Sequence, residues 1–169
     1  MEQTKSNNKT YLWIGGGCLV ILACVIAVFI FGFGGLVWLG LQSPDNVNVS
    51  VDSPISANVG EDIEIRITVT STSSESLELS SIDFSMNFLS GFTITDVNPP
   101  YSDIGQYNVP GGGETFQTYY FYRNIAPGDT IVLTFSGKAV LQGDFSGIID
   151  VCIDSDFNCE SNIARTLIR

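Results

Sequence analysis

The sequence contains no histidine. Histidine is the usual general base near neutral pH and the commonest metal ligand, so its absence excludes Ser-His and Cys-His nucleophile pairs. Glycoside hydrolysis needs two carboxylates at a fixed separation, and nothing in the pattern of the 18 acidic residues marks out two of them. We therefore expect a protein that is not an enzyme.

Basic residues are scarce: seven Lys and Arg stand against 18 Asp and Glu, for a net charge of −11. Glu2, Lys5 and Lys9 are the only charged residues before position 42, so the rest of the chain carries nearly all of the negative charge. An acidic segment of this kind stays soluble and repels nucleic acid. Nucleic acid is accordingly not expected as a partner.

Residues 11–41 lack charge altogether, with the sequence YLWIGGGCLVILACVIAVFIFGFGGLVWLGL. A helix crosses the bilayer core with about 20 apolar residues, so this run predicts one transmembrane helix. Lys5 and Lys9 precede the run, and the next basic residue is Arg66. Because positive charge resists translocation, residues 1–10 are predicted to stay in the cytoplasm and the chain after the helix to be extracytoplasmic.

Two alternatives to an intact anchor are weaker. A cleaved secretory signal has an apolar region of about 7–15 residues followed by a small-x-small site, and neither feature fits residues 11–41. A lipoprotein signal cleaved before Cys24 would leave the apolar residues 25–41 without a role. We expect a single-pass protein of the cell membrane, with the lipid bilayer as its first partner.

Beyond a polar linker at residues 42–46, the apolar period is two. Residues 63–69 alternate isoleucine or valine with polar residues, which is typical of a strand with one buried face. Further candidate strands are residues 47–51, 82–88, 92–97, 116–122, 131–135, 149–153 and 163–168. No segment after Leu41 has apolar residues at helical spacing. The fold class predicted is all-β: one antiparallel Ig-like β-sandwich of seven to nine strands over residues 47–169, preceded by the transmembrane helix.

The four cysteines fall in two places. Cys18 and Cys24 lie inside the apolar run, where they serve as small apolar residues, and Cys152 and Cys159 lie near the C-terminus. Neither pair has the spacing of a zinc site. In an oxidising compartment, Cys152 and Cys159 are expected to form a disulfide with each other.

Oxygen-bearing side chains recur at every second residue in the same region: Asp154, Asp156, Asn158 and Glu160. Alternating oxygen ligands in a loop are how calcium sites are built, so these four are candidate calcium ligands, with no other cofactor expected. The alternative is a polar turn at the tip of a strand pair, closed by the cysteines, with Ser155 and Asp156 as the turn itself.

The middle of the outer segment is rich in aromatic residues. Tyr119, Tyr120 and Tyr122 are candidates for a binding surface, since exposed aromatic rings beside acidic groups stack on sugars or contact a protein. The alternative is that alternate members fill the core while the others cover a sheet face.

Two stretches resemble a known family. Residues 59–69, VGEDIEIRITV, resemble the second strand of bacterial and archaeal extracellular Ig-like repeat domains of the adhesion-related kind. Residues 125–135, IAPGDTIVLTF, resemble their later strand, which enters from a Pro-Gly turn. The chain departs from that family in having one copy, a cysteine pair, and Ser71–Ser74 where an Asn-Thr-Gly turn is usual. The resemblance implies a structural or binding module without catalytic residues.

The function expected is therefore non-catalytic: binding, adhesion or a structural role in a prokaryotic cell envelope, with another protein or a glycan as partner. Two alternatives stay open. One is a pilin-like filament subunit, in which the apolar helix forms the core of the fibre. The other is a ligand-sensing ectodomain that signals through a partner, because ten cytoplasmic residues are too few for a signalling module.

Overall fold

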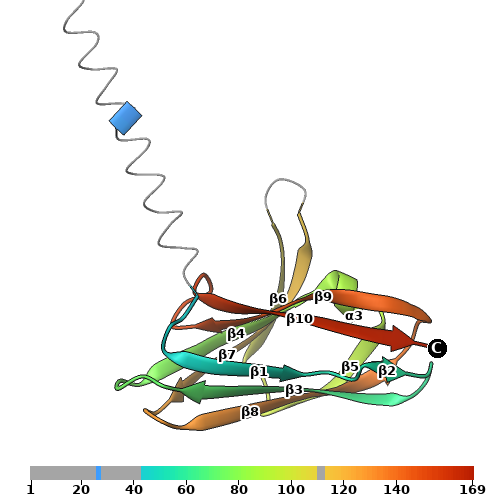
Figure 1. The fold of residues 1–169 in the computed structure, drawn as a ribbon, viewed down its shortest axis with the longest axis horizontal. Helices are drawn as coiled ribbons and strands as arrows, with labels where there is room; N and C mark the ends of the chain where they lie inside the picture. Colours follow the sequence, from blue (N-terminus) through green and yellow to red (C-terminus); the bar gives the residue numbers. More distant parts are fainter. Residues whose placement is uncertain (1–25, 28–42, 110–112) are drawn as a thin grey trace, which may run out of the picture. The chain divides into compact units, whose positions relative to one another are not determined.

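Strands form nearly all of the regular structure in the computed structural model, which describes residues 26–27, 43–109 and 113–169 (Figure 1). The four-stranded sheet has the order β1 (Val47–Asp52), β3 (Asp62–Ser71), β8 (Thr130–Ala139) and β5 (Phe92–Asn98). The six-stranded sheet has the order β2 (Ser56–Ala57), β10 (Cys159–Ile168), β9 (Gly143–Ile153), β4 (Leu77–Ser85), β7 (Thr115–Ile125) and β6 (Asp103–Asn108). All ten strands belong to one compact unit, residues 42–169.

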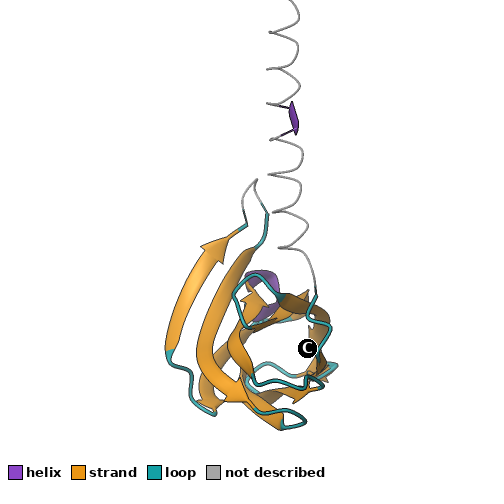
Figure 2. Cartoon of the chain, turned by 90° about the vertical axis from the view of Figure 1, so that its left-hand side faces the viewer, coloured by secondary structure: helices purple, strands orange, loops and turns teal. Residues whose placement is uncertain are grey.

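The two sheets enclose one apolar core, seen from its end in Figure 2. Strands β3 and β8 pair antiparallel with Ile65 opposite Phe135 and Ile67 opposite Leu133, and all four side chains are buried. Because side chains alternate across a strand, the intervening residues of β3 face outward. Each fully buried side chain of this size contributes roughly 1.5–3 kcal/mol relative to an exposed one. The predicted β-sandwich is confirmed.

One predicted strand ends earlier than its apolar pattern suggests. The alternation of residues 82–88 continues to Phe88, but β4 ends at Ser85 and Met86–Leu89 form a single helical turn, α3. Ser85 caps this turn, because its Oγ accepts a hydrogen bond from the backbone N–H of Asn87 at 3.2 Å. Phe88 remains buried in the core. The expectation that no helix follows Leu41 is therefore wrong for these four residues.

Two further strands bring the described total to ten, where seven to nine were predicted. Strand β6 pairs only with β7, at the edge of its sheet, and its residues are almost all exposed, so no alternating apolar pattern reveals it. Strand β2 has two residues and pairs with β10 in parallel. The sandwich is therefore not purely antiparallel. The ends of β6 and β7 extend beyond the neighbouring strands (Figures 1 and 2).

The predicted membrane helix, residues 11–41, falls outside the described residues except for Ile26 and Ala27. Within the part of the chain that is described, no helix combines the length and the apolar character that a membrane crossing requires.

Candidate binding pocket on the six-stranded sheet

The outer face of β4 is buried although it points away from the core. Ile82 and Phe84 belong to the core cluster, so alternation places Ser81, Asp83 and Ser85 on the opposite face. All three are buried, and Asp83 is only 3% exposed. An outward face is normally solvated. Other parts of the chain must therefore cover this stretch of the sheet.

The cover leaves a pocket of about 320 Å³, which we call the Asp83 pocket. Its walls come from β4, β6, β7 and the β9–β10 loop, and its lining residues are Ser81, Asp83, Tyr107, Thr118, Tyr120, Asp156 and Phe157. No basic side chain lines it. Strand register explains the floor, since Asp83 lies opposite Thr118 of β7 on one side and Asp150 of β9 on the other.

Among the described residues, no basic side chain pairs with Asp83. Its Oδ1 is buried without a partner, as are the hydroxyl oxygens of Ser81 and Thr118. Its Oδ2 lies 3.6 Å from Sγ of Cys152, which carries no proton because it is bonded to Cys159. Buried polar groups are normally paired, so a buried carboxyl without a positive partner makes this pocket a candidate site.

The environment of Asp83 disfavours its charged form. Burial raises the pKa of Asp83 from its ordinary value of 3.8 to about 6, and the negative charges of Asp150 and Asp156 add to the effect. The hydroxyls of Thr118 and Ser81 lower that pKa in part, because they lie close enough to hydrogen-bond to the carboxyl. At pH 7 and above the carboxyl is ionised and in need of a positive partner.

Aromatic rings form the sides of the Asp83 pocket. Tyr107 stacks on Phe116 with ring centroids 5.2 Å apart, and Tyr120 stacks on Tyr122 at 5.7 Å. The ring of Tyr120 lies over Gly105 of β6, where a Cβ atom would sit 3.2 Å from Cε2 of the ring. Burial and the nearby charge of Asp83 raise the pKa of Tyr107, which therefore stays neutral. The pocket thus combines a negative floor with uncharged aromatic walls.

A disulfide holds the loop that forms the remaining wall. Cys152 and Cys159 lie opposite each other on β9 and β10 and are bonded, as the sequence predicted. The backbone N–H of Asn158 donates to the carbonyl of Ser155, which places Asp156 and Phe157 at the centre of the turn. The predicted turn at Ser155 and Asp156 is wrong by one residue. Closing a loop of this length stabilises the fold by roughly 2–3 kcal/mol.

The four predicted calcium ligands do not gather around one point. Asp154 Oδ1 accepts a hydrogen bond from the backbone N–H of Glu78 at 2.7 Å, and Asn158 Nδ2 donates to the carbonyl of Ile153 at 3.1 Å. Asp156 lines the Asp83 pocket, and Glu160 belongs to β10. Calcium therefore stays a prediction of the sequence that this arrangement does not support.

The described residues do include one cluster of side chains whose ligand atoms lie close enough together to hold a metal ion. Ligand atoms of Asp83, Cys152 and Cys159 lie within 4.8 Å of one another. Cysteine binds metals as a thiolate, and sulfurs joined in a disulfide offer none. In the oxidised protein these three residues therefore do not make a metal site.

The three tyrosines predicted as one binding surface lie on two faces of the sheet. Tyr120 and Tyr122 are on the outer face, beside the Asp83 pocket. Tyr119 is 6% exposed and packs edge-on against Phe84 and Phe135 of the core. Its removal from the outer surface follows from strand alternation, which is the alternative that the sequence left open.

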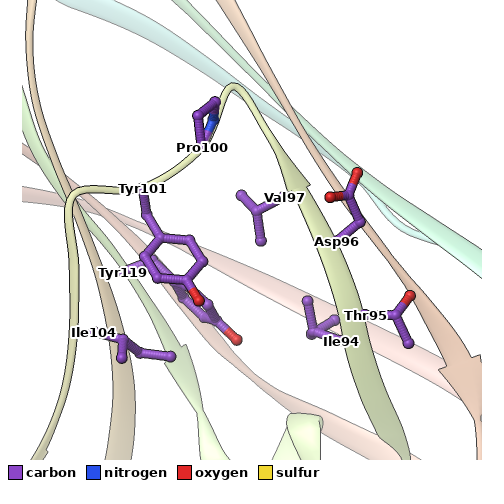
Figure 3. A pocket seen from close by; sticks show the side chains of 8 residues that line it. All are labelled: Ile94, Thr95, Asp96, Val97, Pro100, Tyr101, Ile104 and Tyr119. Carbon is purple, nitrogen blue, oxygen red and sulfur yellow. The ribbon is translucent and has the colours of Figure 1, made fainter.

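Tyr119 also borders a second hollow, of about 370 Å³, between the edge strands β5 and β6. Figure 3 shows Ile94 and Val97 on the side of β5 that faces the tyrosines, and Thr95 and Asp96 on its other side. The rings of Tyr101 and Tyr119 meet edge to face, with centroids 5.3 Å apart. This edge pocket holds no unpaired buried polar atom, so it lacks the feature that distinguishes the Asp83 pocket.

Neither a protein-family model nor a curated protein sequence matches this chain. Among solved structures, it is similar to the alkylpurine DNA glycosylase AlkC of Pseudomonas fluorescens, with 12% identity, a TM-score of 0.44, and coverage of 73% of this chain but 30% of that one. It is similar to a CARDB domain from Pyrococcus furiosus, with 12% identity, a TM-score of 0.42, and coverage of 76% and 93%. It is also similar to the cupredoxin domain of amoB from Nitrosocaldus yellowstonii, with 8% identity, a TM-score of 0.46, and coverage of 76% and 90%. Likenesses at these scores carry no argument about function.

Proposed function

We propose that this chain is a non-catalytic binding module, anchored in a cell membrane by residues 11–41, with its β-sandwich on the extracytoplasmic side. The observation that carries the binding role is Asp83, a buried carboxyl without a positive partner at the floor of an aromatic-walled pocket. Pockets that bind small groups combine apolar walls with a few convergent polar atoms. The sequence has no histidine, so the pocket cannot contain a Ser-His or Cys-His nucleophile pair, which supports binding without chemistry.

The extracytoplasmic placement is supported by three features. Lys5 and Lys9 flank the apolar run on one side, and basic residues stay in the cytoplasm. The disulfide between Cys152 and Cys159 is typical of an oxidising compartment. The strong negative charge of the sandwich keeps it from adhering to anionic headgroups.

The positions of the lysines allow a direct test of this topology. The sequence has three, of which Lys5 and Lys9 precede the apolar run and Lys138 lies on β8. The side chain of Lys138 is 53% exposed, so an amine-reactive reagent reaches it. We expect a membrane-impermeant biotin ester applied to intact cells to label Lys138 and to leave Lys5 and Lys9 unlabelled, as read by peptide mass spectrometry.

Inside-out membrane vesicles provide the matched control, since the same reagent should then label Lys5 and Lys9 and spare Lys138. The opposite pattern in the two preparations would contradict the proposed orientation. Equal labelling of all three lysines in both preparations would contradict membrane anchoring itself.

A further inference from the structure

We propose that the Asp83 pocket binds a primary alkylammonium group, the chemistry of a lysine side chain or of a small aliphatic amine. This inference rests on the proposed binding function and deepens it by naming the ligand.

The floor presents three oxygen acceptors without a basic partner, each on a side chain more than nine-tenths buried. They are Oδ1 of Asp83, Oγ of Ser81 and Oγ1 of Thr118, and all three residues line the pocket. A primary ammonium group has three N–H donors and no acceptor. It therefore matches the floor in the number of hydrogen bonds and in charge. A quaternary ammonium group has no N–H and would leave all three acceptors unpaired.

The aromatic walls suit a positively charged group at the end of an aliphatic chain, which we call the stem of the ligand. Tyr107, Tyr120 and Phe157 contribute ring faces and edges to the pocket. A cation within about 6 Å of an aromatic ring is attracted by the electrons of the ring face. The same rings pack against the methylene groups of the stem. Phe157 is 79% exposed at the centre of the β9–β10 turn, so its ring is free to contact a ligand in the pocket.

Other ligand classes fit less well. Asp83 and Asp156 repel an anion, and no basic residue lines the pocket to offset them. A calcium ion needs about six to eight oxygen ligands, whereas most of this pocket is ring and hydroxyl. A neutral sugar would stack on the tyrosines and could donate hydroxyl groups to Asp83, but it would bring no positive charge to offset the buried carboxylate.

The test uses the full chain in detergent micelles, titrated with n-butylammonium chloride by isothermal calorimetry at about pH 8, where the ligand is protonated and Asp83 is ionised. We expect saturable binding of one equivalent. n-Butanol has the same stem without the charge and should not bind, and tetramethylammonium should bind at least about tenfold more weakly because it has no N–H.

Two substitutions in the Asp83 pocket and one control outside it test whether butylammonium binds there. Asp83→Asn keeps the size of the side chain and removes the charge, and it should weaken butylammonium binding by at least about tenfold. Asp96→Asn, at an exposed carboxyl of β5 in the edge pocket, is the matched control and should leave the affinity unchanged. Phe157→Ala, at an exposed position that the fold does not need, should weaken binding several-fold through loss of one wall.

A last titration distinguishes the two sources of the ligand, a lysine of a protein and a small aliphatic amine. The N-acetyl methylamide of lysine carries the same ammonium between two peptide groups, so binding as tight as that of butylammonium assigns the site to a lysine of a protein. Weaker binding of this derivative assigns the site to a small amine, and both results support an ammonium site. Absence of butylammonium binding, equal binding to Asp83→Asn, or tighter binding of tetramethylammonium would each overturn the inference. None of these results depends on the lysine labelling. The proposed membrane orientation and the proposed ammonium site can therefore be contradicted independently of each other.

Discussion

Replacing Asp83 by asparagine is expected to stabilise the folded sandwich by up to about 3 kcal/mol at pH values above about 6. The pKa of Asp83 is raised from 3.8 to about 6 in the folded chain because the carboxyl is buried. The folded state therefore holds the proton more tightly than the unfolded state does. As pH rises from about 4 to 6, the unfolded chain ionises first, and the folded wild type loses stability relative to the variant.

The measurement is the difference in free energy of unfolding between wild type and Asp83→Asn, from urea titrations of the full chain in detergent. We expect no difference near pH 3, where the Asp83 carboxyl is protonated in both the folded and the unfolded wild-type chain. The full difference should appear at about pH 8. The exposed Asp96→Asn should show no comparable difference at either pH. An Asp83→Asn variant that is less stable than wild type at pH 8 would mean that the carboxylate has a partner in the folded chain.

Phe135→Ala is expected to destabilise the sandwich by about 3–5 kcal/mol. Phe135 is fully buried between the sheets and its ring centroid lies 4.8 Å from that of Phe84 and 5.1 Å from that of Tyr119. Removing the ring loses its burial and leaves a cavity that the two strands carrying these neighbours cannot readily close.

Phe157→Ala is the matched control for this prediction, because it deletes the same ring from a position that is 79% exposed. Its effect on the free energy of unfolding should stay within about 0.5 kcal/mol. The two variants are compared by urea denaturation followed by far-ultraviolet circular dichroism. Equal losses of stability would show that the core is not centred on β8 and the strands opposite it.

A trade-off between stability and binding follows from the two expectations for Asp83. The same substitution is predicted to strengthen the fold and to weaken the affinity for an ammonium group at least about tenfold. Binding sites commonly hold groups that the fold alone would not select. A favourable effect on stability together with a loss of butylammonium binding therefore distinguishes a functional carboxylate from one that serves the fold.

Much of the sandwich could be predicted from residues such as Ile63, Ile65 and Ile67. A strand with one buried face has apolar residues at every second position, and this pattern is visible in the sequence. The same rule fails where that condition is absent. Strand β6 is exposed on nearly all of its residues, so its sequence DIGQYN carries no apolar alternation. Ser85 converts an alternating stretch into a helical turn by a local hydrogen bond, which periodicity does not detect.

The candidate site was less accessible to sequence reasoning. The sequence marks Tyr120 and Asp156 as candidates, but as members of a tyrosine surface and of a calcium loop. Nothing in the sequence distinguishes Asp83, which belongs to the alternating stretch IDFS, because an acidic residue on the outer face of a strand is ordinary. Its burial arises only when Tyr107, Thr118 and the β9–β10 loop meet over it, and these lie 24 or more positions away. Contacts at such separations leave no local signal in the sequence.

The most direct measurement is the titration of the Asp83 carboxyl itself, followed by carbon-13 NMR in the full chain and assigned by its absence from Asp83→Asn. We expect a pKa of about 6 for the free protein, and a lower pKa at saturating butylammonium, because a cation in the pocket favours the ionised form. A carboxyl that titrates near its ordinary value of 3.8, or whose pKa does not change with butylammonium, would contradict the account.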